Sequence, residues 1–230
     1  MPFEQAFSSL IAFLDAAAVV VFAITGALVA SRKQMDIFGF ALLGTVTGVG
    51  GGTVRDVLLG HLPVFWVKQP VYAAIALVVS AVVFFTAHIP ESRYRLILWL
   101  DAVGLSLVCV IGADRGLGAD AGAFIAVVMG VITAVFGGII RDVLGGESPV
   151  ILRREIYVIP ALIGALAFVS FTGVGAPYPV AAATGFLLCF SVRGLALYHG
   201  WSLPPYKSRP GRATSSSPAI PTPDREKPAP

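Results

Sequence analysis

Long apolar runs separated by short polar connectors dominate the pattern of this chain. Seven runs, near residues 10–30, 37–59, 69–88, 96–113, 119–144, 155–172 and 179–198, are apolar and long enough to cross or nearly cross a membrane. They are continuous and rich in Ala, Leu and Val, whereas the strands of a membrane barrel are short and alternate. The pattern therefore predicts an all-α membrane protein with seven transmembrane helices.

The segments outside these runs are short or biased in composition. Residues 1–9 precede the first run, and from about Leu203 to Pro230 the chain is rich in Pro, Ser and charge. A segment of this composition cannot bury enough apolar surface to fold alone. We therefore expect an N-terminal segment at 1–9 and a disordered cytoplasmic tail at 203–230 that the core function does not need.

Tandem glycines interrupt two of the predicted helices. Gly50, Gly51 and Gly52 lie within the second helix, and Gly137 and Gly138 lie within the fifth. A glycine costs roughly 1 kcal/mol against alanine in a helix interior, so tandem glycines favour a kink or break. Backbone groups released from a helix in lipid must be buried in protein or face a water-filled cavity. The glycines therefore predict broken second and fifth helices beside a site, with close helix packing as the alternative.

The chain matches itself without a gap when it is shifted by 86 residues. Over residues 15–72 this register gives 17 identities in 58 pairs, and a Gly-Gly-x-x-Arg-Asp sequence occurs in both copies. Apolar composition alone would not align Asp and Arg inside membrane segments. The match defines one repeat at 10–88 and a second at 96–172, with the run at 179–198 as an addition.

An odd number of helices in each repeat forces the second copy to enter the membrane from the opposite side. We therefore predict two inverted three-helix repeats, related by a pseudo-two-fold axis in the membrane plane, followed by a seventh helix. With the N-terminus outside, 13 Lys and Arg residues fall on the inner side and 3 on the outer side. The positive-inside rule predicts an outside N-terminus and a cytoplasmic C-terminus. We expect the cell inner membrane as the location.

Charged residues at equivalent helix ends are the candidates for a pore mouth or for structural ion pairs. Adjacent residues on a helix do not face each other, so each Arg of an Arg-Asp sequence is expected to pair elsewhere. The repeat suggests one ion pair near the outer face and an equivalent pair near the inner face, flanking one pathway. A purely structural role is the alternative. The predicted pairs are Asp15 with Arg55 and Asp101 with Arg141, and Asp56 and Asp142 complete the candidate set.

Two further pairs of residues have both a functional and a structural interpretation. Thr47 and Thr133 occupy equivalent positions and can line a hydrated path, although Thr also bonds commonly to its own helix. Arg153 and Arg154 can contact anionic lipid headgroups, and a plain positive-inside pair explains them equally well.

Composition excludes several classes of function. Apolar residues make up 57% of the chain and charged residues only 13%, about half the charged share of soluble domains. The sequence has no phosphate-binding loop, no metal-ligand spacing and no nucleophile with a base, so an enzyme, a metal site and a resident cofactor are not expected. The net charge of +3 comes from residues that flank membrane segments, so nucleic acid is not expected as a partner.

Two stretches resemble the prokaryotic trimeric intracellular cation (TRIC) channel family, which older naming calls glycine-transporter-like: GGGTVRDVLLGHLPVFW and GGIIRDVLGGESPVILRREIYV. The resemblance covers residues 10–198. It implies a homotrimer whose protomers each hold a pore for monovalent cations, with potassium favoured modestly over sodium. It also implies that kinked second and fifth helices line the pore, at the glycines named above. Phe136 stands where the first copy has Gly50, as a gate-side residue or a packing residue.

The residues alone do not separate a channel from a carrier. Inverted repeats with interrupted helices also suit a secondary transporter for a small solute such as glycine. A structural protein without transport activity is the third interpretation. On the leading interpretation the partners are permeant potassium or sodium ions, bound membrane lipid and further copies of the chain.

Overall fold

The computed structural model describes residues 2–89, 92–153 and 155–204, with side chains from residue 11 onward. Within these ranges the regular secondary structure is helical, apart from one isolated bridge between Glu155 and Ser202. The all-α fold class is confirmed. The first helix begins at Pro2, so most of the predicted N-terminal segment 1–9 belongs to that helix. Arg154 and the predicted tail from residue 205 onward lie outside the described residues.

The apolar helices follow the predicted spans in order. In the described chain, five helices are long and apolar enough to cross a membrane, and α4 and α7 are shorter apolar helices. Two short elements that the pattern did not predict, α3 and η1, follow α2 and α6. The bounds are α1 Pro2–Arg32, α2 Ile37–Leu58, α3 Phe65–Lys68, α4 Val71–Thr86, α5 Arg93–Gly118, α6 Gly122–Leu144, η1 Val150–Leu152, α7 Val158–Gly173 and α8 Tyr178–His199.

Capping residues set the ends of several helices. Asp36 accepts a hydrogen bond from the Gly39 N–H at 2.8 Å, and Ser92 accepts one from the Arg95 N–H at 3.3 Å. Each bond satisfies a donor that has no partner within the helix, so α2 and α5 begin at these positions. At its C-terminal end α8 stops at Gly200, whose φ of +64° is accessible to glycine without steric cost.

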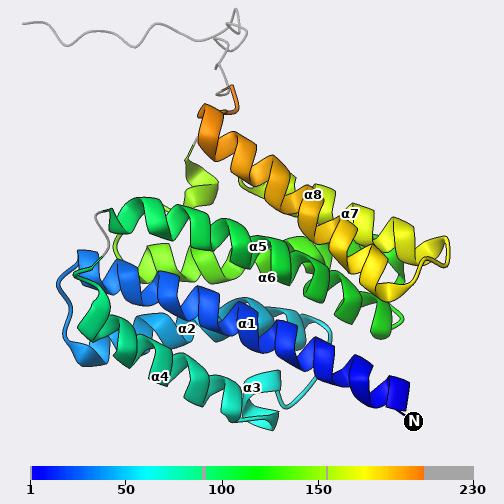
Figure 1. Cartoon of the computed structure of the whole chain (residues 1–230), viewed down its shortest axis with the longest axis horizontal. Coiled ribbons are helices and arrows are strands. Elements are labelled where there is room, and N and C mark those ends of the chain that lie inside the picture. Colours follow the sequence, from blue (N-terminus) through cyan, green and yellow to red (C-terminus); the bar gives the residue numbers. More distant parts are fainter. Residues whose placement is uncertain (1, 90–91, 154, 205–230) are drawn as a thin grey trace, which may run out of the picture.

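The helices form two halves that meet face to face (Figure 1). Helices α1, α2 and α4 pack together in the first half, and α5, α6 and α7 pack together in the second, with α8 against α5 and α7. The halves meet mainly through α1 with α5 and α2 with α6. Each of these helices therefore contacts its own repeat equivalent, and α1 and α5 run in opposite directions (Figure 1). This is the packing that inverted repeats around a two-fold axis produce.

Equivalent glycines mark the point where α2 crosses α6. A Cβ on Gly51 would collide with the carbonyl oxygen of Thr133, and a Cβ on Gly137 would lie 3.1 Å from the carbonyl oxygen of Thr47. The two backbones therefore touch directly, at a separation that leaves no room for a Cβ on Gly51. Because the contacts are reciprocal between equivalent residues, the pseudo-two-fold axis passes through this crossing.

The glycines do not interrupt either helix. Helix α2 continues through Gly50, Gly51 and Gly52, and α6 continues through Gly137 and Gly138. The predicted interruption of the second and fifth helices is therefore wrong, and close packing describes Gly51 and Gly137. The physical reason is the balance of costs: a helical glycine costs about 1 kcal/mol, whereas a backbone group left unpaired in a membrane costs several.

The structural register of the repeat changes by one residue after the Arg-Asp sequence. In the first half Gly44 faces the Ser80 side chain, and in the second half Gly130 faces the Ala165 side chain. Positions 44 and 130 differ by 86, whereas positions 80 and 165 differ by 85. The loop after α6 is therefore one residue shorter than the loop after α2, and the gapless register of the sequence holds only up to that loop. As a result Tyr157, and not Val158, is the equivalent of Tyr72.

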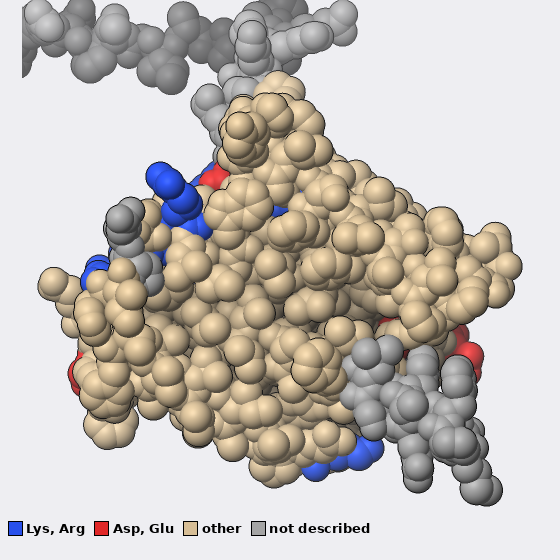
Figure 2. Space-filling model, viewed as in Figure 1, with Lys and Arg blue, Asp and Glu red and all other residues tan. Residues whose placement is uncertain are grey.

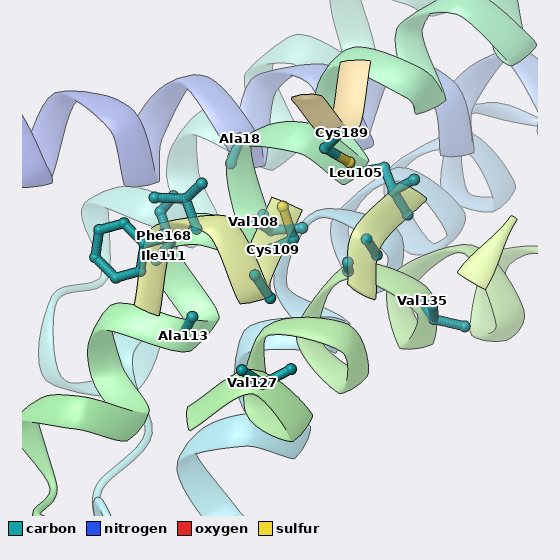
Figure 3. Close-up of a cluster of buried hydrophobic side chains, with 14 of the residues drawn as sticks. Ala18, Leu105, Val108, Cys109, Ile111, Ala113, Val127, Val135, Phe168 and Cys189 are labelled. Atoms are coloured by element: carbon teal, nitrogen blue, oxygen red, sulfur yellow. The ribbon is translucent and has the colours of Figure 1, made fainter. Parts of the chain in front are cut away.

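Among the described residues the largest buried apolar cluster is formed mainly by α5, α6, α7 and α8, together with Ala18 and Phe22 of α1. Leu105, Cys109, Phe168 and Cys189 are all fully buried in it, and both cysteines are free thiols (Figure 3). The outer surface is apolar as well: Figure 2 shows a face that is almost uncharged over the helices, with Lys, Arg, Asp and Glu at its margins. Such a surface is stable in lipid or against another protein, and not in water.

Candidate functional site

Polar side chains are buried in the middle of the helix bundle and at its two ends. We call these the Arg55 end and the Arg141 end, after the arginines that close α2 and α6. Among the described residues the buried polar and charged side chains are Thr25, Thr47, Arg55, Asp56, Ser80, Asp101, Ser106, Thr133, Arg141, Asp142 and Arg193. Buried charge in a membrane segment is costly and marks functional or tightly paired groups.

The two central threonines pack against neighbouring helices. The Thr47 hydroxyl donates to the Leu43 carbonyl at 2.5 Å, and the Thr133 hydroxyl donates to the Met129 carbonyl at 2.6 Å. A Cβ added to Gly26 or Gly112, on α1 and α5, would lie within 2.6 Å of these hydroxyls. The bond of each threonine to its own helix matches the structural interpretation. Their role in lining a path stays a prediction.

Each Arg-Asp sequence closes its helix in the same way. Arg55 Nε donates to Asp56 Oδ1 at 2.9 Å, and Arg141 Nε donates to Asp142 Oδ1 at 2.9 Å. The expectation that adjacent residues do not pair is wrong for both Arg-Asp sequences, because the long guanidinium side chain folds back over its neighbour at the last turn of the helix.

The second oxygen of each aspartate holds the chain that follows the helix. Asp56 Oδ2 accepts the Phe65 N–H at 2.8 Å, and Asp142 Oδ2 accepts the Val150 N–H at 2.9 Å. These N–H groups begin α3 and η1, so one carboxylate both neutralises its arginine and fixes the returning loop. Charge-assisted bonds of this kind are roughly twice as strong as neutral ones.

At the Arg141 end the predicted ion pair is confirmed. Arg141 Nη1 lies 2.7 Å from Asp101 Oδ1, and both side chains are 2% exposed. A further ion pair joins Arg193 to Glu155 at 2.9 Å, and the Arg193 guanidinium lies over the Tyr157 ring at 5.1 Å. Arg141 is thus held by two carboxylates, those of Asp101 and Asp142, inside a buried cluster.

At the Arg55 end the predicted pair of Asp15 with Arg55 is wrong. Asp15 Oδ2 pairs with Arg115 Nη2 at 3.0 Å. Arg55 is left with Asp56 and lies over the Phe65 ring at 5.8 Å. Arg115 has no repeat equivalent, because the corresponding position of the first copy is Val29. Arg115, which only the second copy carries, therefore pairs with the Asp15 carboxylate and breaks the symmetry between the two ends.

Two polar cavities open at the Arg55 end. One, of about 430 Å³, is lined by the end of α2, the following loop, α3 and Arg115. The other, of about 440 Å³, is lined by the end of α5 with His61 and Thr172, and includes Asp114. His61 and Arg115 line both cavities, so the two adjoin. The two cavities together form a polar vestibule beside the ion pairs.

Two other cavities differ in character. A groove of about 420 Å³ between α1, α5 and α8 is lined almost wholly by apolar side chains. At the Arg141 end a cavity of about 540 Å³ lies between the start of α5 and the end of α8, next to Trp99 and Tyr198. Neither contains residues of the Arg-Asp sequences.

The remaining predicted site residues lie apart from one another. Gly52 faces the Phe65 ring, and Gly138 faces the Tyr157 hydroxyl beside the Arg141 cluster. Gly50 approaches Ile140, and Phe136 is 36% exposed on the side of α6. Their role in permeation stays a prediction.

The predicted lipid contact at the Arg141 end has protein partners. Arg153 bonds to the Ser148 carbonyl, the Tyr94 hydroxyl and Glu147. These bonds fit a structural role, and the predicted lipid contact is not tested by them.

Sequence reasoning missed four residues at the two ends: Asp114, Arg115, Tyr157 and Arg193. Arg115 and Arg193 are charged residues at the edges of apolar runs, a pattern in the sequence that could have identified them. Arg115 aligns with Val29 and Arg193 lies in the added seventh helix, so a search guided by repeat matches passes over both residues.

Comparison with known proteins agrees with this architecture. A family model described as "Glycine transporter" matches residues 12–88 and 98–173. The UPF0126 inner membrane protein YadS of Escherichia coli (strain K12) is 43% identical over 205 residues, which cover 86% of this chain and 96% of the relative. A UPF0126 membrane protein of Vibrio cholerae is 37% identical over 203 residues, which cover 86% of this chain and 84% of the relative.

Two solved structures match closely in fold. The TRIC trimeric intracellular cation channel orthologue from Rhodobacter sphaeroides superposes with a TM-score of 0.82 at 58% identity, covering 84% of this chain and 100% of the other. A second structure, solved to explain conductance through TRIC cation channels, superposes with a TM-score of 0.77 at 34% identity, covering 86% and 97%.

Proposed function

This chain belongs to the TRIC cation channel family, and we propose that it is a monovalent cation channel permeable to potassium. The proposal is carried by one observation: charged side chains are buried at the C-terminal ends of the crossing helices α2 and α6, in a chain 58% identical to a cation channel along that chain's whole length. Both matched structures are ion channels and not enzymes, so the chain is assigned to transport.

We place the pathway along α2 and α6, between the Arg55 end and the Arg141 end. The backbone contact of Gly51 with Gly137 closes the bundle between these helices in the conformation described. Conduction then requires α2 and α6 to shift around this contact, and helical glycines lower the cost of such a bend.

We propose a homotrimer in which each protomer holds its own pore, because the Rhodobacter sphaeroides relative is a trimeric channel. The apolar outer surface supplies area for contacts with lipid and with other protomers. The inner membrane location follows the Escherichia coli relative. The distribution of Lys and Arg supports an outside N-terminus, which puts the Arg55 end outside.

A secondary transporter for a small solute such as glycine is the second candidate. The description of the matching family model and the inverted repeat favour it. A channel gives unitary current steps in a planar bilayer. A carrier gives no such steps, because it moves ions or solute one transport cycle at a time.

Single-channel recording in planar bilayers tests the proposal. Purified protein is expected to give unitary potassium currents whose reversal potential follows the cation gradient, with only modest preference over sodium. Saturable glycine uptake by liposomes without unitary currents would establish the carrier instead, and neither activity would favour a structural role.

A variant pair connects the current to the proposed pathway. Phe136→Ala, in the glycine segment of α6, is expected to change the unitary conductance. Phe124→Ala on the same helix is the control, because Phe124 is 78% exposed on the outer surface.

A further inference from the structure

Asp114 is a carboxylate with no ion pair at the Arg55 end. It lies on α5, is half-buried, and lines the 440 Å³ cavity together with His61, Arg115 and Thr172. No hydrogen bond or ion pair joins its side chain to another described residue, although it lies within electrostatic range of Arg115, Asp15 and Arg55. The sequence comparison of the repeats does not single it out, because the equivalent position in the first copy is Leu28.

The neighbouring charges at this end already have partners. Arg55 pairs with Asp56 at 2.8 Å, and Arg115 pairs with Asp15 at 3.0 Å. Three carboxylates therefore face two guanidinium groups in this cluster, and Asp114 carries the unmatched negative charge. Lys68 lines only the other cavity and is exposed, so solvent screens it.

We propose that Asp114 concentrates monovalent cations in the vestibule at the Arg55 end, before they enter the pathway. The inference rests on the proposed channel function and names the residue that attracts the permeant ion. A fixed charge in a cleft with low-dielectric walls focuses the field and raises the local counter-ion concentration. The repeat equivalent Leu28 is an apolar side chain buried in the core at 2% exposure, so the equivalent position toward the Arg141 end carries no charge. The attraction therefore acts from one side of the membrane.

The expected signature is a conductance effect that depends on salt and on direction. The Debye length is about 30 Å at about 10 mM salt and about 3 Å at about 1 M, so an electrostatic contribution is large at low salt and screened at high salt. Asp114→Asn is expected to lower potassium conductance about two- to threefold at about 10 mM KCl, and only for ions that enter from the Arg55 end. At about 1 M KCl the variant and the natural protein should conduct equally.

Asp120→Asn is the matched control. It removes the same charge a few residues further along the chain, where Asp120 is exposed and lines neither vestibule cavity. An equal effect of this variant would show a general surface-charge effect and would refute a specific role of Asp114. An equal loss at low and high salt would make Asp114 structural and would also refute the proposal.

Chemical modification restores or reverses the charge in one and the same protein. A reagent added to the bath should label Asp114→Cys selectively, because the natural cysteines, Cys109 and Cys189, are both 0% exposed. An anionic methanethiosulfonate reagent should restore the low-salt conductance, and a cationic reagent should lower it further. Identical responses to both reagents would overturn the proposal.

The two proposals fail in distinguishable ways. Absence of unitary currents from the natural protein would remove the channel assignment and this inference with it. Unitary currents that Asp114→Asn and the labelled cysteine leave unchanged at low salt would remove this inference alone.

Discussion

Two equivalent aspartates should differ sharply in what they contribute to stability. Asp101 and Asp15 occupy the same position of the two repeats, and the sequence gives no reason to distinguish them. In the structure Asp101 pairs with Arg141 at 2.7 Å with both side chains 2% exposed. Asp15 pairs with Arg115 at 3.0 Å, and these side chains are 12% and 40% exposed. We therefore compare Asp101→Asn with Asp15→Asn.

The burial of each pair sets the expected magnitude. Removing one partner of a buried ion pair costs about 3–5 kcal/mol, because the other charge is left uncompensated. Arg141 retains Asp142 at 2.9 Å, so we expect the lower limit, about 3 kcal/mol, for Asp101→Asn. A pair as exposed as that of Asp15 contributes about 0–1 kcal/mol. The difference corresponds to a melting temperature lower by about 5–10 °C for Asp101→Asn than for Asp15→Asn.

Thermal unfolding in one detergent, followed by tryptophan fluorescence, measures this difference. A cycle with Arg141→Gln should show strong coupling to Asp101→Asn, whereas independent pairs add within about 0.5 kcal/mol. Equal losses for the two aspartate variants, or additive effects of Asp101→Asn and Arg141→Gln, would refute the argument from burial.

Three further predictions follow from contacts at the crossing, the core and the Arg141 end. Gly51→Ala should lower the melting temperature, because the added Cβ overpacks the crossing at a cost of about 1–3 kcal/mol. Gly137→Ala should be nearly neutral, because its 3.1 Å contact needs only a small shift and alanine has the better helix propensity. Equal shifts of the melting temperature in the same detergent assay would contradict this difference. Cys109 and Cys189 should resist a water-soluble maleimide until SDS unfolds the protein, as mass spectrometry would show, and rapid labelling of the folded protein would disprove their burial. Asp142→Asn should destabilise the loop after α6 and speed its proteolysis, and unchanged cleavage would argue against the carboxylate as its anchor.

The apolar pattern was sufficient to predict the helices, because a membrane forces every spanning segment to satisfy its own backbone. Helices α2 and α6 therefore lie where the sequence places them, within a few residues. The predicted interruption at Gly51 and Gly137 failed for the same reason. Glycine lowers helix propensity only slightly, and the contact that explains it comes from a helix about 86 residues away.

The ion pairs show where repeat symmetry stops being informative. Asp101 does pair with Arg141, as symmetry predicts. Asp15 does not pair with Arg55, because Arg115 reaches it from the neighbouring helix. A pairing partner is chosen by distance in three dimensions, and a charge that only one repeat carries is invisible to a comparison of the repeats.

By itself, the sequence determined that this chain is an all-helical membrane protein with two inverted repeats, because hydrophobic length and an odd helix count are properties of the chain alone. Only the tertiary structure decided what its charged and glycine residues do. In that structure the backbones of α2 and α6 touch at Gly51 and Gly137, and two carboxylates pair with Arg141. Asp114 has no ion pair with another described residue at the Arg55 end. Those outcomes depend on how the two halves pack, since side chains distant along the chain compete for the same partners.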